Sequence, residues 1–266
     1  SIGYAAEHGI TIDGPGIFLQ GVILISAIIG ALLLGESGVD SQGDAFAAQA
    51  SALPGSEDEQ AFTSRGWFQT EIWTLFLFSV SGMLIFPVAS DFLTLFVALE
   101  VMSLPLYLMA GMARRRRLLS QEAALKYFVL GSFASAFMLY GSALIYGFAG
   151  SVRFDNVANA FASDSGRSGL AIAGSLMVFI GLLFKVGAAP FHQWTPDVYQ
   201  GSPTALTAFM AAATKVAAFG ALLRVGYVAL AGLRWDIQPA LWVVAGLTML
   251  IGTIVGVAQS DIKRML

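Results

Sequence analysis

The chain has 266 residues, of which 57% are hydrophobic and only 12% are charged, and its mean hydropathy is +0.75. A soluble domain carries about 25% charged residues, so this composition excludes an ordinary soluble domain and indicates a protein that crosses a membrane several times. The net charge of −3 gives no basic surface for nucleic acid, and the absence of cysteine excludes thiolate-held iron–sulfur clusters and disulfides within the chain. With only His8 and His192, a multi-histidine metal or haem site is not expected.

Seven apolar segments are long enough to cross a bilayer, which takes about 20 residues. Residues 36–66, after the first of them, are rich in small and acidic side chains, and we expect a mobile, solvated linker there. The chain thus divides into an N-terminal segment with one span (1–35), this linker, and a membrane domain (67–266). No signal peptide is recognisable, and both ends look cut, so we expect a fragment of a longer protein. The seven segments are 17–35, 67–89, 91–113, 121–149, 169–189, 204–230 and 239–258.

The basic residues predict the orientation of the spans, because cytoplasmic loops carry an excess of Lys and Arg. The run Arg114–Arg117 is the strongest signal and is expected to be cytoplasmic. Counting spans from it puts Arg65, the 190–202 turn and Lys263–Arg264 on the same side. The other side receives a smaller set, Arg153, Arg167 and Arg234. A polybasic lipid-binding patch is an alternative interpretation of the arginine run.

Three ionisable residues stand inside the apolar segments, namely Glu100, Lys185 and Lys215. At the bilayer centre an acid or a lysine costs about 2.5–3.5 kcal/mol on insertion scales. One such residue could be a member of a structural ion pair, but one acid and two lysines on three spans indicate a charge-transfer pathway. Burial penalises a charged lysine and a nearby carboxylate favours it. Glu100 near Lys185 would therefore hold that lysine charged, and separating the two would push the proton on towards Lys215.

The segment from Leu182 to Thr204 combines Lys185 with a proline soon after it. Pro190 lacks a backbone donor, so it disrupts a helix a little over one turn beyond Lys185. Unwound backbone inside a membrane is tolerated only where protein or water satisfies it, and water there would give protons a route. The alternative is that Pro190 ends the helix at an ordinary surface turn. His192 is a candidate proton relay, since its pKa lies near neutral, or a turn residue whose ring forms a hydrogen bond.

Two other charged positions have structural interpretations. Asp197 precedes a polar turn and is expected to be a cap or turn residue. Glu122 and Lys126 are four residues apart, which predicts a local ion pair at the membrane edge. No phosphate-binding loop and no GxGxxG motif after a strand is found, so a nucleotide site is not expected.

Several runs of the sequence together resemble a known family. They are FVALEVMSLPLYLMAG, EAALKYFVLGSFASAFMLYGSALIYGFAG, FKVGAAPFHQWTPDVYQGSPT and ATKVAAFGALLRV. The chain resembles, from about Ile10 onward, the antiporter-like membrane subunits of the bacterial proton-translocating NADH-quinone oxidoreductase (respiratory complex I), subunit N in particular. The run FHQWTPDVYQGSPT is the most specific part of the likeness. More distant relatives are the multisubunit sodium/proton antiporters.

The resemblance implies an all-α fold, a polytopic membrane helical bundle with a discontinuous helix. The family has fourteen helices in which two inverted repeats of five each contain a broken helix. This chain would supply the third to ninth helices, hence the first repeat, while the first two helices and nearly all of the second repeat would be missing. The resemblance places Glu100 on the fifth helix as modulator, Lys185 on the broken seventh as gate, and Lys215 on the eighth as central relay.

The resemblance also implies a function, namely proton translocation across the bacterial inner (plasma) membrane as a non-redox subunit. This chain would bind no cofactor, and NADH, FMN, iron–sulfur clusters and quinone would be bound by partner subunits, both membrane and peripheral. One alternative is a sodium/proton antiporter subunit, which the run WTPDVYQGSP disfavours. Another is the equivalent subunit of a photosynthetic-type plastoquinone oxidoreductase. A structural membrane scaffold would need no buried charges.

Overall fold

The computed structural model describes residues 2–36, 45–46, 52–53, 55–65, 71–114, 116–163 and 169–265. Most of these residues are helical. The elements in chain order are β1 (Gly3–Ala5), β2 (Ile10–Ile12), α1 (Gly14–Gly35), α2 (Glu57–Ser64), α3 (Glu71–Ile85), η1 (Phe86–Val88), α4 (Phe92–Ala110), α5 (Arg117–Ala149), α6 (Phe154–Ser163), α7 (Gly169–Val186), α8 (Trp194–Gly201), α9 (Thr204–Phe209), η2 (Met210–Thr214), α10 (Lys215–Arg224), η3 (Val225–Ala229), η4 (Ala231–Leu233), α11 (Arg234–Ala258) and α12 (Ile262–Met265).

The seven expected spans are confirmed, because seven helical segments in the described part of the chain are long and apolar enough to cross a membrane. Local signals set several of their ends. Asp13 caps α1 by accepting a hydrogen bond from the backbone N–H of Gly16 at 2.8 Å. Asp91 caps α4 in the same way, through the N–H of Thr94 at 2.7 Å. Gly150 ends α5 in the left-handed conformation, with φ of +66°.

The sixth span is not a uniform α-helix. It runs through α9, the π-helical turn η2, α10 and a second π-helical turn, η3. Single π-helical turns within α-helices are often found at functional sites. Lys215 is the first residue after η2. The sequence pattern does not predict either irregular turn.

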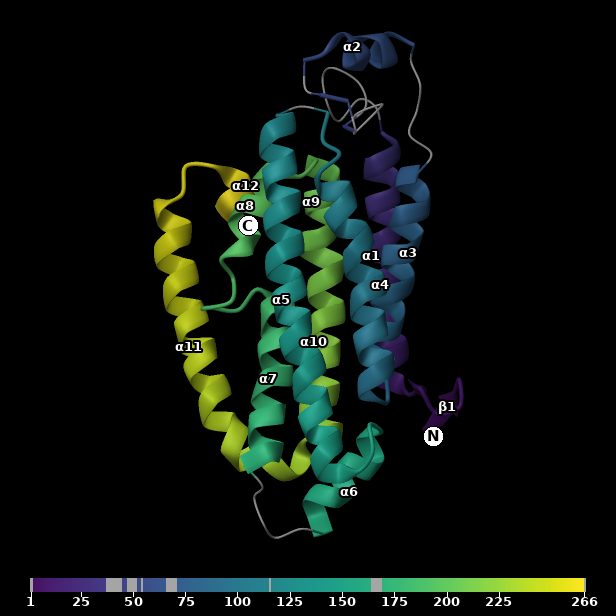
Figure 1. Ribbon diagram of the computed structural model, residues 1–266, viewed down its shortest axis with the longest axis vertical. Coiled ribbons are helices and arrows are strands. Elements are labelled where there is room, and N and C mark those ends of the chain that lie inside the picture. The colour runs from purple at the N-terminus through teal and green to yellow at the C-terminus, as the bar shows by residue number, and fades with distance from the viewer. Residues whose placement is uncertain are drawn as a thin grey trace.

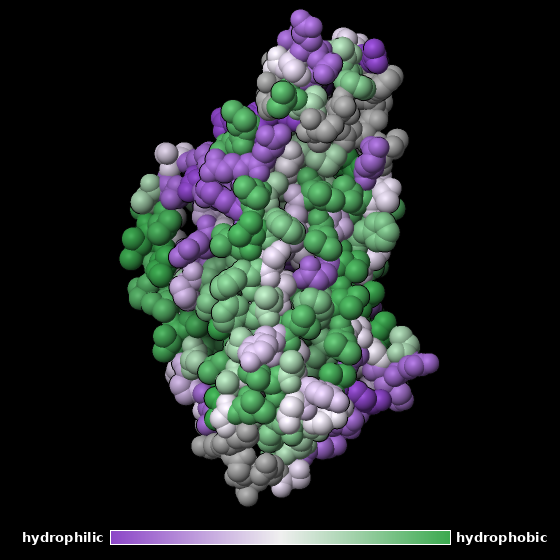
Figure 2. Space-filling model, viewed as in Figure 1, coloured by the Kyte–Doolittle hydropathy of each residue, from purple (hydrophilic) through white to green (hydrophobic). Residues whose placement is uncertain are grey.

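The spans pack side by side as a bundle, with short elements gathered at its two ends (Figure 1). α2, α8 and α12 lie towards one end, and β1 and α6 lie at the other. Figure 2 shows a mainly hydrophobic middle with hydrophilic groups concentrated towards both ends. Because Arg65 follows α2 and Arg153 precedes α6, this arrangement agrees with the predicted grouping of basic residues. Arg115, Arg167 and residues 37–44, 47–51, 54 and 66 of the linker expected at 36–66 lie outside the described residues.

Part of the linker region is described and contacts the bundle. Helix α2 begins with three acidic residues, and Glu59 lies 3.6 Å from the guanidinium of Arg117 at the start of α5. Arg117 also donates a hydrogen bond to the carbonyl oxygen of Ala52. The mobility expected for the linker stays a prediction.

Close backbone approach joins α5 to α7. Gly141 and Gly174 face each other, and a Cβ built on either would lie 2.6 or 2.8 Å from the other's carbonyl oxygen. A side chain at either position would force the two helices apart. This packing places the C-terminal end of α7, with Lys185, inside the bundle, where Lys185 is 3% exposed.

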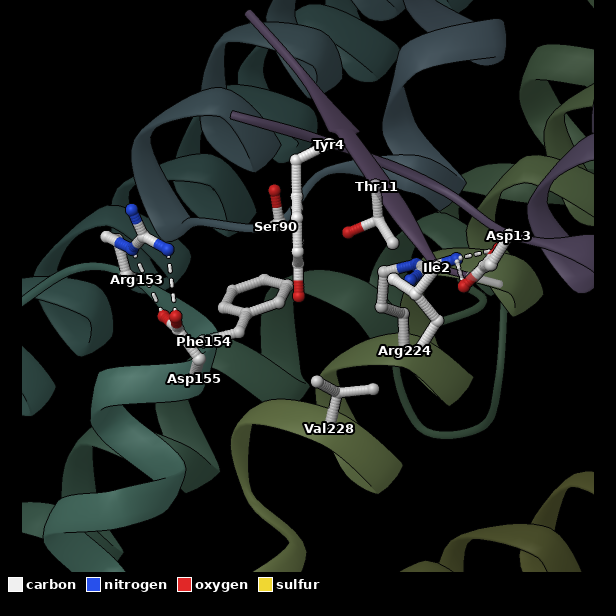
Figure 3. Close-up of a pocket in the computed structure, with 10 residues that line it drawn as sticks. All are labelled: Ile2, Tyr4, Thr11, Asp13, Ser90, Arg153, Phe154, Asp155, Arg224 and Val228. Carbon is white, nitrogen blue, oxygen red and sulfur yellow. Dashed lines mark hydrogen bonds and ion pairs between the residues drawn. The ribbon is translucent and has the colours of Figure 1, made fainter. Parts of the chain in front are cut away.

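The C-terminal end of α10, in the sixth span, is bound to the segment that follows the N-terminal hairpin of β1 and β2. Arg224 donates from Nη2 to both carboxylate oxygens of Asp13 at 2.9 Å and from Nε to the carbonyl oxygen of Pro87 at 2.6 Å. Figure 3 shows this pair beside a pocket of about 100 Å³, with Arg153 and Asp155 paired on its opposite side. The capping residue of α1 thus also anchors α10.

Candidate functional site

Lys185 lies in the last turn of α7 and is bound by side chains from two neighbouring helices. Its ammonium donates a hydrogen bond to Ser103 Oγ of α4 at 2.8 Å and to Tyr127 Oη of α5 at 3.1 Å. The same nitrogen lies 5.7 and 5.2 Å from the ring centroids of Tyr107 and Tyr127, within the range of cation–π attraction. Among the described residues, no carboxylate is paired directly with it. Hydroxyls and aromatic rings therefore solvate this buried charge.

Glu100 lies one turn before Ser103 on α4 and interacts electrostatically with Lys185. Within the described part of the chain, its buried Oε1 has no hydrogen-bond partner. An unpaired buried oxygen of a carboxylate is costly, so a group with such an atom needs a nearby cation or water. The structure therefore brings Glu100 near Lys185, as expected, although without a direct salt bridge.

The helix break beside Lys185 lies between the two ends of the bundle, although Pro190 and Gln193 are exposed at its side. α7 ends at Val186, and Gly187 follows in the left-handed conformation with φ of +80°. The N–H groups of Gly187 and Ala188 donate back to the carbonyl oxygen of Leu183. The N–H of Ala189 donates to Thr248 Oγ1 at 3.0 Å, well inside the span formed by α11. The predicted discontinuous helix is confirmed, with α7 before the break and α8 after it.

Lys215 meets the same helix end from α10. Its ammonium donates a hydrogen bond to the carbonyl oxygen of Val186 at 2.8 Å. A Cβ built on Gly187 would lie only 3.0 Å from that ammonium. A cation is favourable at the C-terminal end of a helix, where the carbonyl groups are unpaired and the helix dipole is negative. Lys185 thus lies in the last turn of α7, and Lys215 binds the carbonyl oxygen of the last residue of that helix.

His192 lies in the break, and the structure does not assign it a role. Its Nδ1 is buried and has no hydrogen-bond partner among the described residues. Its backbone is bonded, since the N–H of Thr195 donates to the His192 carbonyl oxygen at 2.9 Å. The relay role stays a prediction.

Asp197 does not act as the cap or turn residue that the sequence suggested. It lies in the first turn of α8, where its carboxylate accepts hydrogen bonds from Lys126 Nζ and Arg264 Nη1, both at 2.8 Å. These two cations lower the pKa of Asp197, the bond from Lys126 having the larger effect. The local pair of Lys126 with Glu122 is confirmed at 2.7 Å. The sequence suggested a cap because the long-range partners on α5 and α12 have no local signal.

Sequence reasoning also missed the residues that solvate Lys185. Ser103 and Tyr127 lie in apolar segments where single hydroxyls are common, so neither is noticeable alone. One signal was available for Ser103, because it lies three residues after Glu100 and so on the same helical face. Over the residues that the structure describes, no three His, Cys, Asp or Glu side chains gather as metal ligands would.

Comparison with known proteins identifies the family. A family model described as "NADH:quinone oxidoreductase/Mrp antiporter, TM" matches residues 89–266, which include Glu100, Lys185 and Lys215. The chain belongs to this family. It is 57% identical to NADH-quinone oxidoreductase subunit N of Nocardioides sp., over 98% of this chain and 49% of that protein. The chain thus spans about half the length of the curated relatives it matches.

Solved structures of the family have the same fold. Respiratory complex I from Thermus thermophilus matches with a TM-score of 0.74 and 32% identity, over 100% of this chain and 50% of that chain. The Mrp complex from Dietzia sp. matches with a TM-score of 0.68 and 23% identity, over 96% of this chain and 42% of that chain. At that identity the second match shows the fold alone. The expected antiporter-like fold is therefore confirmed.

Proposed function

We propose that this chain is the proton-translocating part of subunit N of a bacterial NADH-quinone oxidoreductase, in the bacterial inner membrane. The observation that carries the proposal is the meeting of two lysines at one helix break, the buried Lys185 from α7 and the half-buried Lys215 from α10. The identity to subunit N proteins supports the assignment to that complex. Its other membrane and peripheral subunits would be the partners.

The geometry supports a transfer between the two lysines. Desolvation penalises the ammonium of Lys185, and the carboxylate of Glu100 opposes that penalty. When Glu100 is neutralised or moves away, the charged form of Lys185 loses support and its proton moves on. Once Lys215 has passed its own proton on, its neutral amine is the next acceptor, because it lies at the carbonyl oxygen of Val186, the residue directly after Lys185. The irregular backbone from 187 to 193 offers polar groups to water that would carry the proton between them.

The chain would act without a redox group of its own. It has no cysteine to hold an iron–sulfur cluster, and quinone reduction, NADH and FMN would belong to partner subunits. Its residues would then only move protons, driven by electron transfer elsewhere in the complex. Enzyme activity in the redox sense is proposed for the complex and not for this chain.

A sodium/proton antiporter subunit is the second candidate, because the fold is shared with the Mrp complex. The two functions differ in their need for electron transfer. In membrane vesicles free of sodium, the proposed subunit would still acidify the lumen when NADH is oxidised. An antiporter subunit would move protons only against a sodium gradient, without NADH.

The test replaces Glu100 and Lys185 separately in the full-length subunit within the assembled complex. We expect Lys185→Ala and Glu100→Gln to lower the number of protons moved per electron while the subunit remains assembled. Glu71→Gln at the exposed start of α3 is the matched control and should leave that ratio unchanged. A normal ratio in both site variants would indicate a structural scaffold instead.

A further inference from the structure

Tyr127 lies where α5, α7 and α8 meet. The side chain is fully buried, and its hydroxyl accepts a hydrogen bond from Lys185 Nζ at 3.1 Å. Its ring stacks on that of Trp194, the first residue of α8, with centroids 4.6 Å apart and planes inclined by 4°. One side chain therefore contacts both the buried lysine and the helix that follows the break.

The residue beside Tyr127 binds the same short helix at a more exposed place. Lys126 lies 2.8 Å from Asp197 of α8, and Arg264 of α12 lies 2.8 Å from the other oxygen of that carboxylate. Adjacent residues of α5 thus hold α8 twice, by an aromatic stack inside the bundle and by an ion pair at its edge. The Lys126 and Asp197 side chains are 42% and 32% exposed, so the outer contact is accessible to water and the inner one is not.

α8 is a short helix that is separated from the spans around it and is held to them by a few side-chain contacts. It has only eight residues, and a non-helical segment, 187–193, separates it from α7. Trp194 attaches it to the end of α7, because Trp194 Nε1 donates a hydrogen bond to the carbonyl oxygen of Phe184 at 3.0 Å and the two rings stack with centroids 5.4 Å apart. A shift of α8 would therefore move Trp194, and the stacked ring of Tyr127 would have to follow or lose the stack.

We propose that Tyr127 is a positioning residue for Lys185, and that it links the ammonium to the position of α8 and hence to the Lys126–Asp197–Arg264 cluster. This inference rests on the proposed proton transfer through Lys185. When Trp194 of α8 stacks on Tyr127, the Tyr127 hydroxyl accepts a hydrogen bond from the Lys185 ammonium and stabilises the charged form of Lys185. When α8 moves, that acceptor is withdrawn and the proton is released more readily.

Several other groups face Lys185 and would titrate or interact with it. α4 contributes Glu100, Ser103 and Tyr107. The buried Tyr199 of α8 interacts with Tyr127 instead, and its hydroxyl has no hydrogen-bond partner among the described residues. α10 places Lys215 at the adjacent Val186. Tyr127 differs from all of these because it alone contacts both Lys185 and Trp194.

The first test removes only the hydroxyl. Tyr127→Phe keeps the ring and its stack, and Tyr140→Phe, on the exposed face of the same helix, is the matched control. Proton translocation by the assembled complex is measured from pH 5 to 9 at a constant rate of NADH oxidation. A hydrogen bond to a charged group is strong enough to shift a titration by about one pH unit. We expect the half-maximal pH to fall by about that amount in Tyr127→Phe, and an unchanged profile in this variant would overturn the proposal.

The second test acts at the partly exposed outer contact. Asp197→Asn weakens the attachment of α8, while Asp155→Asn breaks a matched Asp–Arg pair at the other end of the bundle. Asp197→Asn should shift the pH profile in the same direction, and adding it to Tyr127→Phe should give no further shift. If the pH profile of Asp197→Asn is the same as that of Asp155→Asn, α8 does not act through Tyr127. The same conclusion follows if the shifts of Asp197→Asn and Tyr127→Phe add up in the double variant. Lys185→Ala is measured in the same assay. Normal proton pumping in Lys185→Ala would refute proton transfer through Lys185, whereas lowered pumping in Lys185→Ala with an unchanged profile in Tyr127→Phe would refute only the role of Tyr127.

Discussion

Lys215 donates its hydrogen bond to the carbonyl oxygen of Val186, at 2.8 Å, and so occupies the C-terminal end of the helix that carries Lys185. The two lysines come from different spans, yet they share one helix terminus. A change at that terminus acts on both of them, which makes the break a point where their protonation can be coupled.

The close approach of Lys215 to Gly187 predicts an effect of a single methyl group. Gly187→Ala would introduce a Cβ 3.0 Å from the ammonium of Lys215, at a residue with φ of +80°. Gly150→Ala is the matched control, since its φ is +66° but nothing lies within 4 Å of the added Cβ. Both variants carry the strain of a left-handed alanine, roughly 1–2 kcal/mol.

Only Gly187→Ala should therefore lower the proton-to-electron ratio of the assembled complex, by displacing Lys215. Equal losses in the two variants would mean that backbone strain alone explains the effect, and that the contact with Lys215 has no part in it.

The pair of Arg224 and Asp13 predicts where stability is most sensitive to loss of an ion pair. Their side chains are 10% and 18% exposed, so Arg224→Ala would leave the carboxylate of Asp13 partly buried without its cation. Such a loss costs about 3–5 kcal/mol. The thermal inactivation midpoint of the purified complex should fall clearly in Arg224→Ala and little in Arg153→Ala, whose ion pair with Asp155 is more exposed. A fall of similar size in both would contradict the assigned role of Arg224.

The charged cluster around Asp197 predicts a pH range in which α8 stays attached. Lys126 and Arg264 lower the pKa of Asp197 below its usual value of 3.8. A depressed pKa contributes stability that is present above the usual value and is lost as the pH falls through the lowered one. Between pH 5 and 8 the carboxylate of Asp197 stays ionised, so hydrogen exchange of the α8 amides, corrected for intrinsic rates, should not become faster as the pH falls from 8 to 5. Protection that declines from pH 8 to 5 would show that another group controls the attachment.

Much of this site could be predicted from the sequence, because a charge inside an apolar segment is conspicuous. Glu100, Lys185 and Lys215 were identified in that way, and Pro190 predicted the break. The sequence left two interpretations of the break open, and the bond from Ala189 to Thr248 decides between them.

The partners of these residues could not be predicted in the same way. Ser103 and Tyr127 contact Lys185 only through tertiary packing, and hydroxyl residues are ordinary in membrane helices. The π-helical turn before Lys215 has no glycine or proline in it, so nothing local marks it. The long-range partners of Asp197, on α5 and α12, likewise have no signal in its own segment.

Proton transfer from the buried Lys185 requires the half-buried Lys215 as its acceptor. The measurement is the number of protons moved per electron by the fully assembled complex that carries Lys215→Ala in the full-length subunit, with assembly checked by the subunit content of the purified complex. We predict a lowered ratio with the subunit content unchanged. A normal ratio in the fully assembled Lys215→Ala complex would contradict proton transfer between Lys185 and Lys215.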